Sequence, residues 1–522
     1  MSSRTISTAR AWRSFASAAL LLGLSMPGPG VAQDYAAKGF QVATPTPREA
    51  TPANLATGKE VYGQYCSQCH GDDGDGAGAM ADLLTPRPRD FRRGVYKIRR
   101  TMQGELPVDD DLFQIITRGM PGTSMPAWEG ILTPEQIWQL VDYIKTFSLD
   151  FDDFPAEQEF LLQGKPEATP ESIERGAALY VEAECAKCHG ASGRGNGPSA
   201  AELEDEWENK IVPADLTQPW TMRGGSSVED YFRTLTTGLN GTPMPSFSDA
   251  FDAAQLWDLA NYLDSMGRQP AWGEIVRAPK TDTVPDDPDD PAWEQAPAMD
   301  IRLAGQIIQE PRLFNPAVQS LRARALFDDD EVGLLVSWTD RFENDGQGET
   351  PSDQLAVLFP AQKLEKGKKP YFLMGDRRRQ VDAWEWSAAS GTRNLLARGS
   401  DSVTPRESSL KATASYKDGE YRVILRRSLA TGQEDEVEFT PGQMVPIAWN
   451  VWEGDNGEQG KQRAISRWYY LLLEPKTPWT TWLWPLVIVS LAGGGEAFGM
   501  RRLRRRWAED DATSQSQGAA ES

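Results

Sequence analysis

Two short segments of the chain contain every cysteine and every histidine of its 522 residues. They read CSQCH at Cys66–His70 and CAKCH at Cys185–His189. Two thiols at this spacing can form thioethers with the vinyl groups of a haem, and the adjacent imidazole can then bind the iron. A four-cysteine zinc site or two small-loop disulfides would use the same thiols, but neither needs a histidine after each second cysteine. The motifs therefore predict two covalent haem c groups, attached through Cys66, Cys69, Cys185 and Cys188.

A repeat in the sequence extends beyond these two motifs. The motifs are 119 residues apart, and the same offset relates residues 112–147 to residues 231–266. Both blocks contain a GTxMP segment and share a tryptophan and a tyrosine position. The segments PRPRDF and VPADLT, between motif and block, are out of this register, so a compensating insertion and deletion must exist. The chain therefore contains a duplicated unit.

Each haem iron needs a ligand opposite its histidine, and the sequence contains no third histidine. Methionine is a usual ligand in that position and raises the reduction potential. Met120 and Met125 both follow the first motif, but only Met125 has a methionine, Met244, at the repeat position. We therefore expect Met125 and Met244 to be the second ligands. The haem c irons would be bound by His70 with Met125 and by His189 with Met244.

Residues 53–150 and 171–270 are each expected to form a small all-α domain. Each begins at or just after a Thr-Pro pair, a good helix start, and continues into a haem motif. The last expected helix of each has apolar residues at helical spacing, which would face the first helix and the haem edge. Both segments resemble class I cytochromes c.

Residues 291–475 have a different pattern. Segments such as EVGLLVSWTDRF and YRVILRRSL are short and rich in Val, Ile and Trp, which is typical of strands. In SYKDGEYRV, Asp418 and Gly419 lie between two such segments, as in a hairpin turn. The pattern predicts a β-sandwich. On these residues alone it could be a carbohydrate-binding module, an interaction scaffold or a cofactor domain.

Three segments of this region carry a family resemblance: PAWEQAPAMDIRL, KPYFLMGDRRRQVDAWEWSA and VWEGDNGEQGKQRAISRWYYLLLEP. They resemble the haem-binding domain of the ethylbenzene dehydrogenase γ subunit, in which a β-sandwich holds a non-covalent haem b. The resemblance implies that Met374 and Lys461 bind the haem b iron. The alternative is that Met374 is a core residue and Lys461 a solvated one. Other lysines lie nearer to Met374 in the sequence: Lys363, Lys366, Lys368 and Lys369.

Related subunits occur in dimethylsulfide dehydrogenase, selenate and chlorate reductases, and nitrite oxidoreductases. The resemblance implies a complex with a molybdenum catalytic subunit and an iron–sulfur subunit, for which nitrite or a similar small substrate is expected. The chain would relay electrons between that complex and a soluble cytochrome c or a terminal oxidase. It would be an electron-transfer subunit of the respiratory chain rather than the catalytic subunit. It departs from simple γ subunits through its two cytochrome c domains and its membrane tail.

Both ends of the chain indicate export and anchoring. Residues 1–32 have arginines, a short apolar stretch and a Val-Ala end, the order of a signal peptide. Residues 477–499 include 19 positions without a charge, about the minimum for a transmembrane helix, and arginines follow. Because basic residues favour the cytoplasm, 500–522 would be a cytoplasmic tail and the rest would face the periplasm. A buried or interfacial helix is the alternative.

The formal charge of −22 excludes nucleic acid as a natural partner. It could steer a basic redox partner or serve only solubility. Two other functions remain open on the sequence. One is a dihaem dehydrogenase acting on a sulfur compound, although no spare Cys or His exists for an open iron site. The other is a dihaem cytochrome whose sandwich binds polysaccharide or a structural partner, which would contain only haem c.

Overall fold

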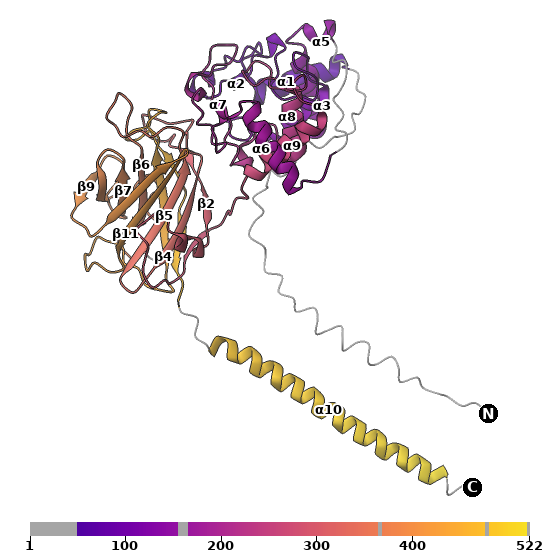
Figure 1. The fold of residues 1–522 in the computed structure, drawn as a ribbon, viewed down its shortest axis with the longest axis vertical. Helices are drawn as coiled ribbons and strands as arrows, with labels where there is room; N and C mark the ends of the chain where they lie inside the picture. The colour runs from indigo at the N-terminus through magenta and orange to yellow at the C-terminus, as the bar shows by residue number, and fades with distance from the viewer. Residues whose placement is uncertain (1–49, 155–164, 364–367, 476–479, 519–522) are drawn as a thin grey trace.

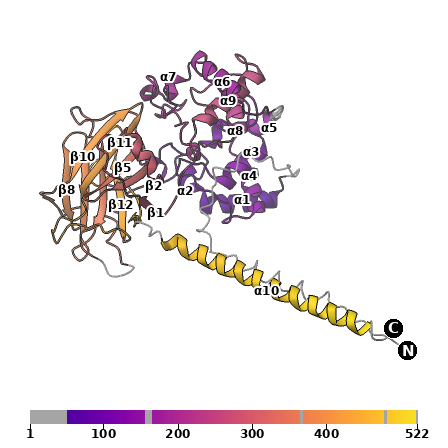
Figure 2. The same ribbon diagram turned by 60° about the horizontal axis from the view of Figure 1, so that its bottom comes forward.

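The computed structural model describes residues 50–154, 165–363, 368–475 and 480–518. Figure 1 shows a helical part, a β-sandwich and one long separate helix, so the chain is multidomain. The signal peptide expected at residues 1–32 lies outside the described residues. In Figures 1 and 2, the two haem-motif helices lie on the side of the helical part that faces the sandwich.

The helical part contains the two copies of the repeat. The first copy comprises α1 (Pro52–Tyr65), α2 (Ser67–His70), η2 (Ala81–Leu83), η3 (Phe91–Arg93), α3 (Asp109–Arg118), α4 (Pro134–Lys145) and α5 (Asp150–Asp153). The second copy comprises α6 (Pro170–Glu182), α7 (Ala186–His189), η4 (Ala200–Glu202), η5 (Pro219–Thr221), α8 (Val228–Thr237) and α9 (Ala253–Met266). The Thr-Pro helix starts are confirmed. Thr51 and Thr169 each cap their helix by accepting a hydrogen bond from a backbone N–H three residues on.

In each copy the first helix packs against the last long helix at a glycine. A Cβ atom built on Gly58 of α1 would lie 2.1 Å from the Gln139 carbonyl oxygen of α4. A Cβ atom on Gly176 of α6 would lie 2.1 Å from the Asp258 carbonyl oxygen of α9. Any other residue would force the helices apart. The glycine therefore brings the last helix close to the segment that leads into the haem motif, as the sequence predicted.

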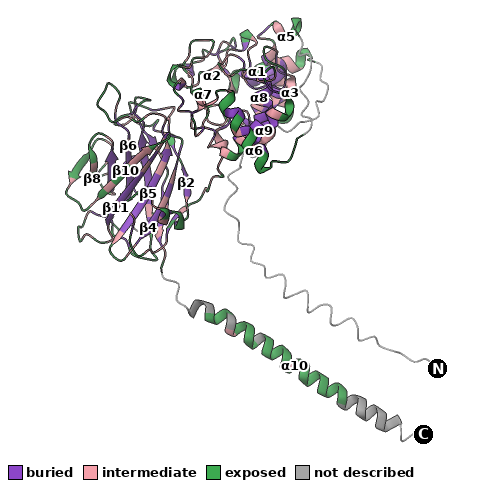
Figure 3. Cartoon of the chain, in the orientation of Figure 1, coloured by how far each residue is buried: buried purple, intermediate pink, exposed green. Residues whose placement is uncertain are grey.

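The sandwich consists of two sheets, shown in Figure 3 with largely buried strands. Its strands are β1 (Ile275–Ala278), β2 (Met299–Arg302), β3 (Ala304–Gly305), β4 (Ser320–Phe327), β5 (Glu331–Thr339), β6 (Gln354–Pro360), β7 (Val381–Ser387), β8 (Gly391–Ala397), β9 (Val403–Arg406), β10 (Lys411–Lys417), β11 (Glu420–Ser428), β12 (Met444–Trp452), β13 (Ala464–Ile465) and β14 (Tyr469–Leu473). The larger sheet has the order β1-β14-β12-β6-β7-β8-β9, with β13 and β3 off this path, and the smaller has β10-β11-β5-β4-β2. The hairpin at Asp418 and Gly419 is confirmed: both have positive φ, at 52° and 79°.

The larger sheet is apolar on both faces. Its inner face packs on the smaller sheet and includes Trp384 and Trp449, both fully buried. Because side chains alternate along a strand, the neighbouring positions form a second buried cluster on the outer face. The members of this outer cluster are Ala356, Leu358, Met374, Val381, Ala383, Leu395, Ala397, Ala448, Trp452 and Trp468. A buried outer face means that loops must cover this side of the sheet.

Helix α10 (Thr480–Gly518) runs away from both folded parts (Figure 1). Its segment Leu483–Ala508 is long and apolar enough to cross a membrane, by length and composition. None of the most apolar window of this segment is buried against the described protein. The helix continues without a break through the arginines that follow Met500.

Because α10 is exposed along this window, ending the chain at Pro475 is expected to leave the folded parts unchanged. The thermal unfolding midpoint and the haem content per chain, measured in detergent for both forms, should match those of the full chain. A lower midpoint for the shortened chain would show that α10 stabilises the sandwich or the helical part.

Candidate haem sites

Both motif histidines are held in the same way. His70 Nδ1 lies 3.1 Å from the Arg89 carbonyl oxygen, and His189 Nδ1 lies 3.1 Å from the Ala214 carbonyl oxygen. Burial lowers the pKa of both imidazoles, while the carbonyl contact raises it, so each ring is neutral at pH 7. A neutral imidazole that donates from Nδ1 presents Nε2 as its lone-pair nitrogen, which is the form that binds a metal.

A second matched contact fixes the end of each motif helix. The Tyr62 hydroxyl donates to the Gly71 carbonyl oxygen at 2.7 Å, and the Tyr180 hydroxyl donates to that of Gly190 at 2.7 Å. Both glycines have a φ of 77°, a conformation that other residues adopt only with strain. The chain therefore turns sharply after each histidine, and the tyrosine of the preceding helix holds that turn.

The four motif thiols are partly exposed and unpaired. Burial raises the pKa of Cys66 to about 12 and that of Cys185 to about 11, so both are neutral thiols at pH 7. Among the described residues, no three His, Cys, Asp or Glu side chains form an arrangement suited to a metal ion. All four thiols are free of disulfide bonds and so are available for thioether bonds.

The two expected methionine ligands lie in loops of the same geometry. Met125 N donates to Thr123 Oγ1 at 3.1 Å, and Met244 N donates to Thr242 Oγ1 at 3.2 Å. In each loop the methionine carbonyl accepts from the residue five positions earlier, Met120 or Leu239. Met120 thus occupies the position of Leu239, as the repeat predicts, and its backbone serves to close the loop.

The structure locates the break in register between the copies. The carbonyl that holds the imidazole lies 19 residues after His70 but 25 residues after His189, so the second copy has six extra residues there. They fall in a loop with a bridge between Glu204 and Lys210. The shift in register is visible in the sequence, but these carbonyls have no side-chain signature. Aligning the Pro-Arg-Asp of residues 88–90 with the Pro-Ala-Asp of residues 213–215 places Arg89 on Ala214 and would have found them.

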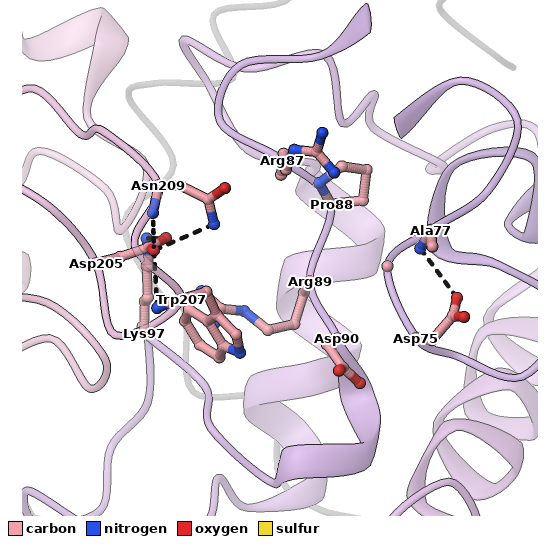
Figure 4. Close-up of a pocket in the computed structure, with 11 residues that line it drawn as sticks. Asp75, Ala77, Arg87, Pro88, Arg89, Asp90, Lys97, Asp205, Trp207 and Asn209 are labelled. Atoms are coloured by element: carbon pink, nitrogen blue, oxygen red, sulfur yellow. Dashed lines mark hydrogen bonds and ion pairs between the residues drawn. The ribbon is translucent and has the colours of Figure 1, made fainter. Parts of the chain in front are cut away.

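Basic side chains gather where the two copies meet. Burial and the positive charges of Arg89 and Arg223 lower the pKa of Lys97 to about 8. In Figure 4, Lys97 and Arg89 line a cavity of about 240 Å³ with Asp205 and Trp207. Carboxylates lie among these cations: Asp205 is 3.9 Å from Lys97, and the charges of Asp205 and Asp90 act on Arg89.

For the haem b site, Met374 lies in the outer cluster of the larger sheet and is 5% exposed. Its φ of 64° is unusual for a side chain with a Cβ, and Gly375 follows with a φ of 77°. Four members of the cluster are alanines, and their short side chains make this face of the sheet flat enough for a planar ring system to lie on it. The residues present therefore fit a flat apolar cofactor.

Lys461 reaches the same region from another loop. Its Nζ lies 2.7 Å from an Asp401 carboxylate oxygen and is partly exposed. The loop that carries Asp401 also contacts Met374, because Gly399 N donates to the Met374 carbonyl oxygen at 2.9 Å. Met374 and Lys461 therefore border one loop, and the amine is held as an ion pair. Asp401 was not found from the sequence, since nothing in its local pattern marks it.

The other lysines near Met374 are placed differently. Lys369 Nζ donates to the Trp468 carbonyl oxygen at 3.4 Å and lies 4.5 Å from the centre of the Tyr470 ring. Trp468 is itself a member of the outer cluster, so this amine also borders it. Lys363 and Lys368 are exposed, and Lys366 lies outside the described residues.

Comparison with known families divides the chain in the same way. Residues 53–144 match the family of cytochrome c oxidase cbb3-type subunit III, and residues 173–267 match the cytochrome c family. Residues 290–411 and 401–464 match the ethylbenzene dehydrogenase family.

Individual relatives match either part of the chain. The ORF7 haem subunit assigned to a respiratory nitrate reductase of Haloferax mediterranei is 26% identical over 215 residues, 40% of this chain and 77% of the relative. The chlorate reductase subunit gamma of Ideonella dechloratans is 29% identical over 185 residues, 34% of this chain and 76% of the relative. The cbb3-type cytochrome c oxidase subunit CcoP of Azospirillum sp. strain B510 is 30% identical over 217 residues, 41% of this chain and 62% of the relative.

The fold and the haem motifs define a multihaem electron-transfer protein with covalent haem c. This chain joins cytochrome c and cbb3-type domains to an ethylbenzene dehydrogenase-like domain, and its homologues include haem subunits of the nitrate and chlorate reductase kind.

The methionine assignment is tested by three single substitutions. Met125→Leu or Met244→Leu is expected to keep the covalent haem but lower the potential of that haem and open its iron to carbon monoxide. Carbon monoxide would then bind half of the c haem in each variant, measured by difference spectroscopy. Met120→Leu is the matched control and should change neither property. If Met120→Leu opens the first iron and Met125→Leu does not, the assignment is wrong.

Proposed function

We propose that the chain is the membrane-anchored electron-transfer subunit of a periplasmic oxidoreductase, with two covalent c haems and one non-covalent b haem. Its partners are a molybdenum catalytic subunit and an iron–sulfur subunit, of the nitrite oxidoreductase type. One observation carries the proposal: two haem-motif histidines and two methionine loops of matched geometry are joined in one chain to an ethylbenzene dehydrogenase-like domain. The named relatives, a nitrate reductase haem subunit and a chlorate reductase gamma subunit, support it.

The ligand sets favour electron transfer over catalysis. With His70 and Met125 on one iron, and His189 and Met244 on the other, neither iron has an open position for a substrate. The sequence has no further histidine or cysteine to build an open site. An iron with fixed ligands can gain and lose an electron with little rearrangement. This argues against the dihaem dehydrogenase acting on a sulfur compound.

The segment 306–319 supports an order for the haems, because it joins the Lys461 loop to the first cytochrome unit. Gln306 Nε2 donates to the Lys461 carbonyl oxygen at 3.0 Å, and Ala317 N donates to a Glu458 carboxylate oxygen at 3.0 Å. These two bonds tie the segment to the loop that would ligate the b haem.

On its other side, the same segment is bonded to loops around the first c haem. Asn315 Nδ2 donates to the Leu83 carbonyl oxygen at 2.7 Å, and Gln319 Nε2 donates to the Gly122 carbonyl oxygen at 3.5 Å. Leu83 ends η2, which follows the first haem motif, and Gly122 lies in the Met125 loop. We infer that electrons pass between the b haem and the first c haem.

The second c haem would then exchange electrons with a soluble cytochrome c or a terminal oxidase. The net charge of −22 would steer a basic partner toward it. The catalytic complex would dock at the sandwich and exchange electrons with the b haem.

Helix α10 would anchor the chain in the inner membrane. A crossing needs about 20 apolar residues, and Leu483–Ala508 spans 26 residues. The arginines between Arg501 and Arg506 would lie on the cytoplasmic side, with the haems on the periplasmic side. A chain ending at Pro475 would then be released in soluble form, whereas release of the full chain by salt alone would contradict the anchor.

The b haem is tested by extraction. Lys461→Ala and Met374→Ala are each expected to remove or spectrally shift the acid–acetone-extractable haem and to leave both covalent haems in place. A lysine binds iron only as the neutral amine, so the Asp401 ion pair must open when the haem binds. Lys369→Ala is the matched control. Pyridine haemochrome spectra of the extract and the residue measure both haem types.

Two outcomes would contradict this assignment. Loss of the extractable haem with Lys369→Ala but not with Lys461→Ala would move the ligand to Lys369. Finding only haem c in protein made with ample haem supply would exclude the third site, and would favour a dihaem cytochrome with a sandwich that binds something else.

The relay order is tested by removing one c haem at a time. A Cys66→Ser, Cys69→Ser variant is expected to slow oxidation of the b haem by added ferricytochrome c at least tenfold, because its next electron carrier is gone. A Cys185→Ser, Cys188→Ser variant should still pass electrons from the b haem to the first c haem. Stopped-flow absorbance resolves both steps, and the b-haem spectrum reports that the sandwich is folded. The reverse pattern would place the second c haem next to the b haem.

A further inference from the structure

The loop with six extra residues in the second copy contains Trp207, between η4 and η5. The Asp205 carboxylate shapes this loop: its Oδ1 atom accepts from Trp207 N at 3.1 Å, from Asn209 N at 3.0 Å and from Asn209 Nδ2 at 3.2 Å. Figure 4 shows these bonds beside the cavity between the copies. The backbone at Trp207 is therefore held in place by its own loop.

Trp207 lies against the first copy at the histidine of the first haem site. The Arg89 guanidinium lies 4.3 Å from the centre of the indole ring and that of Arg93 lies 5.2 Å from it (Figure 4 shows Arg89). Both distances are those of cation–π contacts. Arg89 is also the residue whose carbonyl accepts from His70 Nδ1. The stack thus holds the Arg93 guanidinium and that of Arg89, whose positive charge acts on the His70 imidazole.

The same indole contacts the methionine loop of the second copy. A Cβ atom on Gly241, three residues before Met244, would lie 3.0 Å from a Trp207 ring carbon. Glu206 N, from the Trp207 loop, donates to the Gly241 carbonyl oxygen at 3.2 Å. Gly241 has a φ of 72°, a conformation that favours glycine. The Trp207 ring also leaves little room for a side chain at this position.

We propose that Trp207 is a positioning residue that couples the two c-haem sites. Its ring contacts Arg89, whose carbonyl accepts from the histidine of the first site. The same ring contacts the Gly241 loop, which carries the methionine of the second site. The inference rests on the proposed binding of two c haems. A guanidinium near an iron favours the ferrous state, since the ferric site carries one more positive charge. Trp207 therefore raises the potential of the first haem and keeps Met244 on the second.

The first copy has no counterpart of this contact. The residue at the Gly241 repeat position, Gly122, faces the backbone of Thr221, whose carbonyl oxygen would lie 3.0 Å from its Cβ. No tryptophan ring reaches it through an extra loop, because the six residues are present only in the second copy. The contact is therefore present once in the described residues, between a side chain of the second copy and the segment that holds the histidine of the first.

The test compares four single variants of the full-length protein. Trp207→Ala is expected to lower the potential of the first haem and to let carbon monoxide bind the second haem, with loss of its methionine-to-iron charge-transfer band. Trp207→Phe should restore both properties, because the indole N–H has no hydrogen-bond acceptor among the described residues and only the ring surface is needed. Arg89→Gln should lower the first potential and leave the second haem unchanged.

Trp272→Ala is the matched control. The indole N–H of Trp272 also has no acceptor among the described residues, and the Arg302 guanidinium lies 4.3 Å from the centre of its ring. Trp272 differs from Trp207 in its place, because it lies in the connection between α9 and the sandwich. It should change neither haem. Redox titration followed at each haem, with carbon monoxide difference spectra, gives both readouts.

The proposal is overturned if Trp207→Ala changes only one haem or neither, or if Trp272→Ala produces the same changes. A haemochrome count of two c haems per chain in every variant separates these results from failure of the proposed function. Fewer than two in the unmodified chain would refute the proposed function, and this inference with it.

Discussion

The hydrogen bond from each motif imidazole to a backbone carbonyl is the contact around which the helical part is organised. It leaves Nε2 of each imidazole as the nitrogen that can bind a metal, and the haem iron that we propose would lie on that side of the ring. A backbone acceptor cannot be lost by substitution of its side chain. This explains how Arg89 in one copy and Ala214 in the other can serve the same purpose.

The matched geometry of the two haem motifs and the two methionine loops was predictable, because these segments contain rare side chains at fixed spacing. Cysteine and histidine occur nowhere else in the sequence, and the repeat separated Met125 from Met120. What surrounds those ligands was not predictable. The carbonyl acceptors have no side-chain signature, and the extra loop with Trp207 lies where the repeat loses its register.

In the sandwich the strands and the hairpin at Asp418 could be predicted from alternation and turn chemistry. The position of the outer apolar cluster could not, because it depends on which loops fold back over the larger sheet. Met374 and Lys461 are distant in sequence, and their meeting at the loop of Asp401 is a product of that folding. The resemblance to a family named these two residues; the strand pattern did not.

The break in register has a consequence for how such a chain can evolve. The two expected ligands of each iron are 55 residues apart in both copies, although the carbonyl between them has moved by six residues, because the gain before η5 is offset before α8. Each copy can thus acquire new surface without losing its metal. The two cytochrome units can then diverge in the loops where they meet. One aromatic side chain inserted there can give their two haems different reduction potentials.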